Sequence, residues 1–281
     1  MIVFLIFLQA CQGETKPHFI ADIPSPGNNP TSVEGIELGR KLFDLKLSNG
    51  HSGPVSCNSC HKPDSGFSSY SMNLLNMKKR SIPSLYNLAY SPHFFWDGRE
   101  KSLESVVIKP IPNHEEMNFS LKKMVNDLNK NPSFLKEFKS AFGTDSIYTA
   151  LVSRALAQYI RSLKSEVQPN SETQSKGQIL FEKYCATCHA GSHTSDFKMR
   201  VSVIANSGPD SGKFHLSRRK SDIYSFKTPS LAKIKLTRPY MHDGRYSDLK
   251  YVVEDYSRIL EIVELKNTQN QKQLIKFLST L

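Results

Sequence analysis

Two copies of a Cys-x-x-Cys-His motif constrain this chain more than any other feature of its sequence. They read CNSCH at 57–61 and CATCH at 185–189, so corresponding cysteines lie 128 residues apart. Each motif places two thiols on one short turn, where they can bond to the vinyl groups of a haem while the adjacent histidine binds the iron. The motifs predict two covalently bound haem c groups, held by Cys57, Cys60, His61, Cys185, Cys188 and His189.

Other chemistry is known for such motifs, because Cys-x-x-Cys also occurs in zinc sites and redox dithiols. A zinc ribbon needs two paired motifs in one small module, and these two are too far apart for that. Disulfides within the motifs would leave both histidines without a role. Haem attachment therefore accounts for the residues best.

Helical patterns flank each motif. Gly and Leu-Phe stand at helical spacing in 35–48 and again in 176–189, ahead of or across the cysteines, and apolar-periodic stretches follow at 146–163 and 271–281. Strand-like alternation is scarce. We predict an all-α fold of two cytochrome c-like domains in tandem, at 32–165 and 166–281, joined near the polar stretch 164–176.

An internal repeat links the two halves. Residues 83–107 align without a gap on 229–253 at a constant offset of 146, and nine of the twenty-five positions are identical. Both copies contain Asp-Gly-Arg, in FFWDGR and YMHDGR, and Trp96 of the first copy corresponds to His242 of the second. The repeat favours two domains in the chain.

The N-terminus begins with an apolar run, MIVFLIFLQAC, that ends in a sequence resembling a lipoprotein processing box. We expect a signal peptide at 1–11 with Cys11 lipidated, and a Pro-rich tether at 12–31. The run lacks basic residues, so an ordinary export signal is the alternative. The expected location is the periplasm or cell envelope, with contact to a membrane only through the lipid, because the run is too short to span a bilayer.

The chain is basic, with a formal net charge of +11. Its basic residues are scattered rather than clustered with base-stacking aromatic residues, so we predict no nucleic-acid binding. Short clusters such as 78–80 and 218–220 favour solvated surfaces or contact with an acidic redox partner.

The motifs together resemble the bacterial di-haem cytochrome c peroxidases, a family that includes the MauG-type maturation enzymes. The segments that carry the resemblance are LGRKLF, PVSCNSCHKPDSGFS, FFWDGR, NHEEM and KTPSLAKIKLTRPYMHDGRYSDLKYVV. The resemblance implies a cytochrome c peroxidase, an oxidoreductase with one electron-accepting haem and one peroxidatic haem. It also implies that hydrogen peroxide is reduced to water with electrons from a small cytochrome c or cupredoxin, that a calcium ion lies between the domains, and that the protein forms homodimers.

The resemblance also assigns roles to single residues. Trp96 matches a tryptophan between the haems that assists electron transfer, and Glu116 matches a catalytic acid-base glutamate. Thr237 and Pro239 match positions whose carbonyl oxygens bind Ca²⁺, a cation that prefers oxygen ligands. The third calcium position is asparagine in the family and Ser81 here.

The repeat predicts a difference between the two irons. Helical spacing places Tyr256 on an apolar face toward the second haem, and the family has its sixth iron ligand at this position. Met241 is the alternative ligand. A purely structural role for Tyr256, as a tyrosine buried in the core, is the other alternative. In the first half the corresponding residue is Pro110, which has no side-chain donor. We therefore expect an open coordination position at the first haem, with Glu116 beside it to move protons.

Simpler explanations exist for several of these residues. Glu116 has the alternative of a surface acid at a helix start, and Trp96 of packing at a domain interface. Arg99 and Arg245 suit haem propionates, but pairing with the neighbouring aspartates explains them almost as well.

Three functions remain open from the sequence. The first is the peroxidase, with its first haem open at rest because the loop 62–85 has no histidine, although Met72 and Met77 lie in it. The second is a MauG-type oxidase acting on a protein or organic substrate. The third is a di-haem electron carrier without catalysis, which would have no use for Pro110 and Glu116 beside a bare iron.

Overall fold

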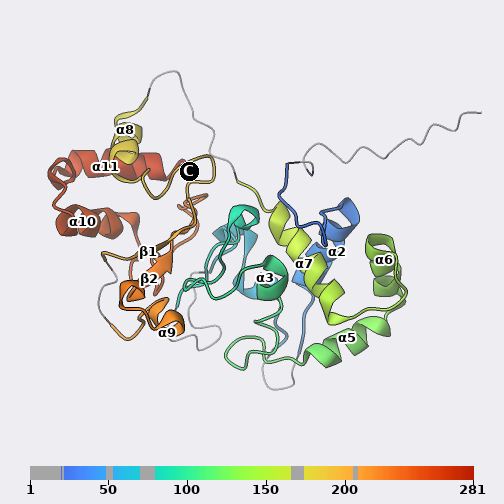
Figure 1. Cartoon of the computed structure of the whole chain (residues 1–281). Coiled ribbons are helices and arrows are strands. Elements are labelled where there is room, and N and C mark those ends of the chain that lie inside the picture. Colours follow the sequence, from blue (N-terminus) through green and yellow to red (C-terminus); the bar gives the residue numbers. More distant parts are fainter. Residues whose placement is uncertain (1–19, 21, 49–52, 70–79, 166–173, 205–207) are drawn as a thin grey trace, which may run out of the picture.

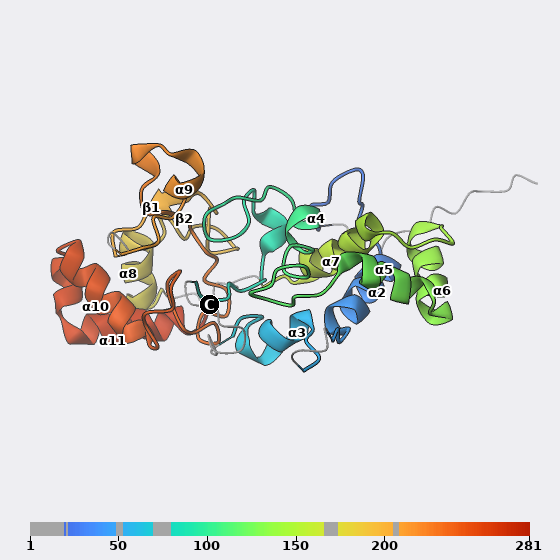
Figure 2. The same ribbon diagram turned by 90° about the horizontal axis from the view of Figure 1, so that it is seen from below.

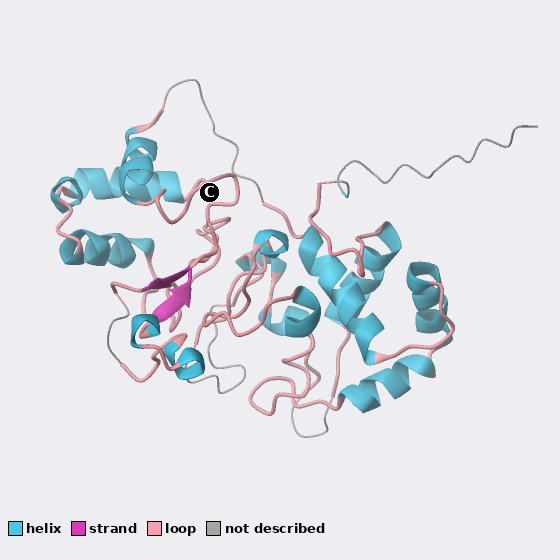
Figure 3. Cartoon of the chain, in the orientation of Figure 1, coloured by secondary structure: helices cyan, strands magenta, loops and turns pink. Residues whose placement is uncertain are grey.

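The computed structural model describes residue 20 and residues 22–48, 53–69, 80–165, 174–204 and 208–281. Figure 3 shows that the regular secondary structure of these residues is almost entirely helical, and the predicted all-α fold is confirmed. In the described part of the chain, the single small sheet pairs β1 (Met199–Val201) with β2 (Ser225–Lys227) in antiparallel orientation.

The helices fall into two groups that lie at opposite ends of the molecule (Figure 1). The N-terminal group contains α2 (Val33–Asp44), α3 (Cys57–Cys60), α4 (Leu103–Val106), α5 (Leu121–Asn129), α6 (Pro132–Phe142) and α7 (Thr149–Ser162), with the 3₁₀ turns η1 (Pro63–Ser65) and η2 (Leu88–Tyr90). The C-terminal group contains α8 (Lys176–Tyr184), α9 (Phe214–Ser217), α10 (Leu249–Ile259) and α11 (Thr268–Leu278), with η3 (Lys220–Asp222) and η4 (Val263–Lys266). Figure 2 shows the same separation from below, with α4 beside α7 in the N-terminal group.

The same helix crossing organises each group. Helix α2 packs against α7, and α8 packs against α11. Both crossings depend on a glycine: a Cβ on Gly39 would lie 2.1 Å from the carbonyl oxygen of Ala155, and a Cβ on Gly177 would lie 2.1 Å from that of Gln273. The Gly and Leu-Phe pattern in the sequence therefore marks the close approach of two helices in each half.

Two hydrophobic cores follow from these crossings. The first is built around Leu42, Phe43 and Leu156, and the second around Leu180 and Leu274, all of which are almost completely buried. The proposed domain boundary at 165/166 adjoins residues 166–173, which lie outside the described residues.

The repeat is visible in the backbone. Phe94 and Glu100 form an isolated antiparallel bridge, and so do Tyr240 and Tyr246, which are their counterparts at an offset of 146. Between the bridged residues, Gly98 and Gly244 have φ values of 71° and 68°, in the left-handed region that glycine adopts readily. The two copies therefore form the same local turn.

The copies diverge after the turn. The Ser102 side chain caps α4, and the Asp248 side chain caps α10, at equivalent positions. Helix α4 has only 4 residues, whereas α10 has 11 and continues through Tyr256. In the first half the chain turns away instead, and Pro110 lies in that turn.

Two backbone hydrogen bonds join the halves reciprocally. The Ser81 amide donates to the His242 carbonyl oxygen at 2.6 Å, and the Lys227 amide donates to the Trp96 carbonyl oxygen at 2.8 Å. Ser81 and Lys227 are separated by the repeat offset of 146, and so are Trp96 and His242. The contact therefore has approximate two-fold symmetry.

The expected tether at 12–31 is corrected at its C-terminal end. Asn29 is 2% exposed, donates to the carbonyl oxygen of Arg154 at 3.2 Å and accepts from the Gln158 side chain at 2.8 Å. Ile23 is buried as well. This segment thus packs on the N-terminal core, because its apolar and amide side chains find partners there. Cys11 and the rest of the expected signal peptide lie outside the described residues, among which no helix has the length and apolarity to cross a membrane.

Candidate functional site

One cavity of about 930 Å³ extends between the two groups of helices and contacts both motifs. Its volume lies near the upper end of the range of roughly 300–1,000 Å³ for small-molecule sites. The cavity brings together all the residues that the sequence assigned to a site: Cys57, Cys60, His61, Trp96, Glu116, Cys185, Cys188, His189, Thr237, Pro239, Met241 and Tyr256. Residues from both halves thus face a common space.

The two motif histidines are oriented in the same way. Nδ1 of His61 lies 2.8 Å from the carbonyl oxygen of Phe67, and Nδ1 of His189 lies 3.2 Å from that of Thr194. A carbonyl can only accept, so each Nδ1 carries a proton and each Nε2 keeps its lone pair. Burial lowers the pKa of His189 to about 4, with the same direction for His61, so both rings are neutral, as metal ligands must be.

The motif cysteines are free thiols rather than disulfides. Cys57 and Cys60 lie at the two ends of the single turn α3, which Ser56 and Ser59 cap reciprocally. Burial raises the pKa of Cys57 to about 12 and that of Cys185 to about 11. Each site therefore presents two thiols and one imidazole nitrogen to the cavity, and this donor set fits covalently attached haem.

The second site also contains a candidate second ligand for the iron, Tyr256. Tyr256 of α10 lines the cavity, and burial together with the nearby Cys188 and Cys185 raises the pKa of its hydroxyl to about 12. Among the described residues, none forms a hydrogen bond with this hydroxyl. Met241 also lines the cavity, at φ 72°, and its carbonyl oxygen accepts from the Ser81 hydroxyl at 2.7 Å.

In the first half, Pro110 stands at the repeat position of Tyr256, and Glu116 follows six residues later. Both residues line the cavity, and the loop between them is closed by a hydrogen bond from the Met117 amide to the Pro110 carbonyl oxygen at 3.2 Å. Burial raises the pKa of the Glu116 carboxyl, and this carboxyl in turn contributes to the raised pKa of Cys60. The Glu116 carboxyl is therefore close enough to the first motif to interact with Cys60 electrostatically.

Asn113 orients Glu116, although Asn113 was not among the predicted site residues. Its Nδ2 donates to Oε1 of Glu116 at 2.8 Å, which opposes part of the rise in the pKa of the carboxyl. With Oε1 held in this way, Oε2 is the oxygen available for proton exchange. The signal available in the sequence was the spacing of three residues in NHEE, which a tight turn brings together.

Trp96 stands between the halves. Its indole Nε1 donates to the carbonyl oxygen of Ser81 at 2.9 Å, and its own carbonyl oxygen accepts from Lys227. Ser81 thus contacts both repeat copies, through Trp96 in the first and through Met241 and His242 in the second. From the sequence, Ser81 was predicted only to occupy the third calcium position.

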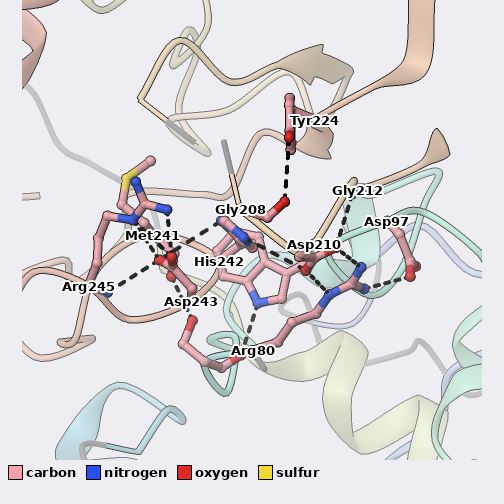
Figure 4. Close-up of polar contacts among 12 residues, drawn as sticks. Arg80, Asp97, Gly208, Asp210, Gly212, Tyr224, Met241, His242, Asp243 and Arg245 are labelled. Atoms are coloured by element: carbon pink, nitrogen blue, oxygen red, sulfur yellow. Dashed lines mark hydrogen bonds and ion pairs between the residues drawn. The ribbon is translucent and has the colours of Figure 1, made fainter. Parts of the chain in front are cut away.

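A charged network surrounds this contact, and it also escaped the sequence analysis (Figure 4). Arg80 donates to Asp97 at 2.5 Å and to both carboxylate oxygens of Asp210, at 2.7 and 2.9 Å. Arg99 donates to Asp97 at 2.8 Å, and His242 Nε2 lies 3.7 Å from Asp210. Burial alone would raise the pKa of Asp97, which is 1% exposed, but the hydrogen bond and charge of Arg80 lower it.

The repeated arginines differ in surroundings. Arg99 lines the cavity and stacks on the Phe95 ring at 3.5 Å, whereas Arg245 pairs with Asp243 and donates to the Ile204 carbonyl oxygen at 3.1 Å. Pairing with the neighbouring aspartate is present in both copies. Only Arg99 is placed on the cavity for a propionate.

Lys227, at the end of β2, is a further charged residue that the sequence did not single out. It lines the cavity, is 8% exposed, and has its Nζ 5.5 Å from the centre of the Phe197 ring. Burial lowers the pKa of its ammonium group to about 8.

The calcium assignment stays a prediction. Thr237 and Pro239 lie on the cavity, and Arg238-Pro239 is a cis peptide bond. The Ser81 hydroxyl is directed to the Met241 carbonyl oxygen. Among the described residues, no group of three or more His, Cys, Asp or Glu side chains converges where it could hold a metal ion.

Comparison with known proteins places the chain. Residues 33–178 match the family model described as di-haem cytochrome c peroxidase. The methylamine utilization protein MauG of Methylophilus methylotrophus is 31% identical over 289 residues, covering 92% of this chain and 85% of that protein. The cytochrome c551 peroxidase of Nitrosomonas europaea is 29% identical, with coverage of 92% and 83%.

Solved structures share the fold. A MauG-like protein associated with microbial copper homeostasis aligns with a TM-score of 0.81 at 23% identity, covering 96% of this chain and 95% of that one. The diheme peroxidase BthA from Burkholderia thailandensis aligns with a TM-score of 0.67 at 18% identity, with coverage of 87% and 75%. The family match, the MauG relative and the paired haem-attachment motifs agree, and the chain is a member of the di-haem cytochrome c peroxidase family, an oxidoreductase family whose members carry two haem c groups.

Proposed function

We propose that this protein is a di-haem peroxidase that reduces hydrogen peroxide to water with electrons from a small cytochrome c or cupredoxin. The overall reaction consumes one peroxide, two protons and two electrons and gives two waters. The two haem groups, when bound, supply the iron that binds peroxide and the centre that receives electrons. All other steps depend on side chains of this chain.

The difference between the two sites carries the proposal. The cavity wall contains the phenol of Tyr256, close to Cys185 and Cys188 of the second motif, whereas the residue at the corresponding repeat position of the first half is Pro110, which has no side-chain donor atom. A substrate oxygen therefore has access near His61 and is excluded by a ligand near His189. An electron carrier gains nothing from such an asymmetry.

Glu116 supplies the proton transfer. Oε2 accepts a proton from the peroxide oxygen next to the first site and returns it to the outer oxygen, so that the departing group leaves as water. The raised pKa of the carboxyl brings it closer to neutral pH and makes both directions of transfer accessible. The Asn113 side chain holds the carboxyl in one orientation during both transfers.

Trp96 is proposed to connect the sites. Its indole lines the shared cavity, and its main chain and side chain are bonded to residues at the contact of the two halves. Electrons from the donor enter at the second site, and the aromatic ring shortens the path to the first.

Peroxide turnover by the purified oxidised protein, with a reduced small cytochrome as donor, tests the proposal. Glu116→Gln should lower turnover by about 10²–10⁴-fold, the usual contribution of a positioned acid-base group. Glu115→Gln is the matched control, because Glu115 is the exposed neighbour of Glu116. Equal rates for the wild type and Glu116→Gln would remove the catalytic role.

A MauG-type oxidase is the second candidate. Two relatives named methylamine utilization protein MauG are 31% and 32% identical to this chain. The loop residues Met72 and Met77, which bear on whether the first haem is open at rest, lie outside the described residues. Oxidation of an added protein substrate by peroxide, without a cytochrome donor, would favour this function over the first.

A further inference from the structure

Lys227 differs from the other cations on the cavity wall. Arg80, Arg99 and Arg200 each contact an aspartate at 2.5–2.8 Å. In the part of the chain that the structure describes, Lys227 has no carboxylate partner, although only 8% of its surface is exposed. An unpaired buried ammonium is costly, so the position favours an anion that the described residues do not provide.

The surroundings of Lys227 assign it to the second site. Its Nζ lies over Phe197, which follows the second motif by eight residues and is 3% exposed. The adjacent Thr228 accepts a hydrogen bond from Arg200, another residue of that segment, at 2.9 Å. The amide of Lys227 donates to the Trp96 carbonyl oxygen, so the backbone of Lys227 lies where the second site meets the first repeat copy.

The first half has no equivalent charge. At the repeat offset of 146, the counterpart of Lys227 is Ser81, whose hydroxyl is already bonded to the Met241 carbonyl oxygen. The neighbouring Arg80 is fully engaged by Asp97 and Asp210. An anion at the second site thus meets an uncompensated positive charge that the first site lacks.

We propose that Lys227 binds a propionate carboxylate of the haem held by His189, and that this ion pair raises the reduction potential of that haem. The haem carries two carboxylates, and the cavity offers one buried cation for them at this position. A cation paired with a haem carboxylate favours the reduced state of the haem, because reduction lowers the positive charge on the iron. The inference rests on the assignment of two haems and not on peroxide turnover.

Redox titration of the purified holoprotein, followed by the visible spectrum, tests the proposal without peroxide. Lys227→Gln should change the one-electron equilibrium constant of the second haem about tenfold, a fall of about 59 mV in its potential, and leave the first haem unchanged. Lys227→Arg keeps the charge and should stay close to the wild type. Lys198→Gln is the matched control, because Lys198 adjoins Phe197 in the sequence but its side chain is 75% exposed.

Several outcomes decide the matter. Unchanged potentials in Lys227→Gln overturn the proposal, and so does an equal fall in Lys227→Arg. If Lys227→Gln does not retain its second haem, a pyridine haemochrome count on both variants replaces the titration: retention in Lys227→Arg supports the pair, and loss in both overturns it. A wild-type potential that depends on added chloride, with that dependence absent in Lys227→Gln, would assign the position to a free anion and also overturn the proposal.

Discussion

The indole nitrogen of Trp96 donates a 2.9 Å hydrogen bond to the carbonyl oxygen of Ser81. The amide of the same Ser81 donates to His242, the counterpart of Trp96 in the second repeat copy. The tryptophan is thus held by a residue that is itself held by the other half of the molecule. A backbone carbonyl can only accept here, so this bond leaves the proton on the indole nitrogen.

Replacing Trp96 with phenylalanine should separate its two roles. Phenylalanine keeps an aromatic ring at the interface but loses the bond to Ser81, which should cost about 1 kcal/mol of unfolding free energy. Electron transfer from the second haem to the first should slow while both haems stay bound. Stopped-flow absorbance after mixing the reduced protein with peroxide measures this step. His242→Phe is the matched control in the other repeat copy, and an equal slowing there would remove the special role of Trp96.

Replacing Tyr256 with methionine should raise the potential of the second haem. Methionine as an axial ligand favours reduced iron, and a shift above about 59 mV, tenfold in the equilibrium constant, is expected. Redox titration combined with electron paramagnetic resonance measures the potential and the ligation together. Spectra of Tyr256→Phe that match those of the wild type would show that the phenol is not a ligand.

Glu116→Gln should change how stability depends on pH. The folded-state pKa of Glu116 is raised, so its contribution to stability is present below the unfolded pKa and is lost as pH rises through the folded pKa. Glutamine does not titrate. The variant should therefore gain stability relative to the wild type as pH increases from about 4 toward 7, in urea unfolding at a series of pH values. A constant difference between the two proteins across this range would contradict the raised pKa.

Arg80→Gln should destabilise the contact between the halves. It leaves Asp97 buried with Arg99 as its remaining arginine partner, and breaking a buried pair costs roughly 3–5 kcal/mol. The depressed pKa of Asp97 means that this stabilisation is present above the unfolded pKa and is lost as pH falls through the folded pKa. The difference between wild type and variant should be largest near neutral pH and shrink below about pH 4. Calorimetric unfolding at several pH values gives the comparison, with Arg40→Gln as an exposed control.

The helix crossings predict a sharp response to small substitutions. Gly39→Ala or Gly177→Ala would place a methyl group 2.1 Å from a backbone oxygen, and the helices would have to move apart at a cost of roughly 1–3 kcal/mol. Gly27→Ala is the control, because a Cβ there meets nothing within 4 Å. Thermal unfolding of the three variants measures the difference. A loss of stability in Gly27→Ala equal to that in the other two would argue against the crossings as the cause.

Much of the fold was accessible from the sequence because its signals are local. The haem motifs, the Gly and Leu-Phe spacing of α2 and α8, and the periodicity of α7 and α11 each lie within one helix or one turn. The repeat added the difference between Tyr256 and Pro110, since it fixed which positions to compare. The structure then places these residues on one cavity.

The remaining site residues were not accessible because their partners are distant. Asp210 meets Arg80 across 130 positions, and Asn29 meets Gln158 across 129, without any local pattern. Lys227 is one of 37 lysines and arginines, and β2 is too short to show alternation that would mark it as buried. Extending the repeat two residues toward the N-terminus would have aligned it with Ser81 and drawn attention to the missing charge.

The reciprocal bonds from Ser81 to His242 and from Lys227 to Trp96 are the arrangement found where two identical subunits meet about a two-fold axis. The two halves therefore meet as an internal dimer, in which each half donates one of the two bonds and accepts the other.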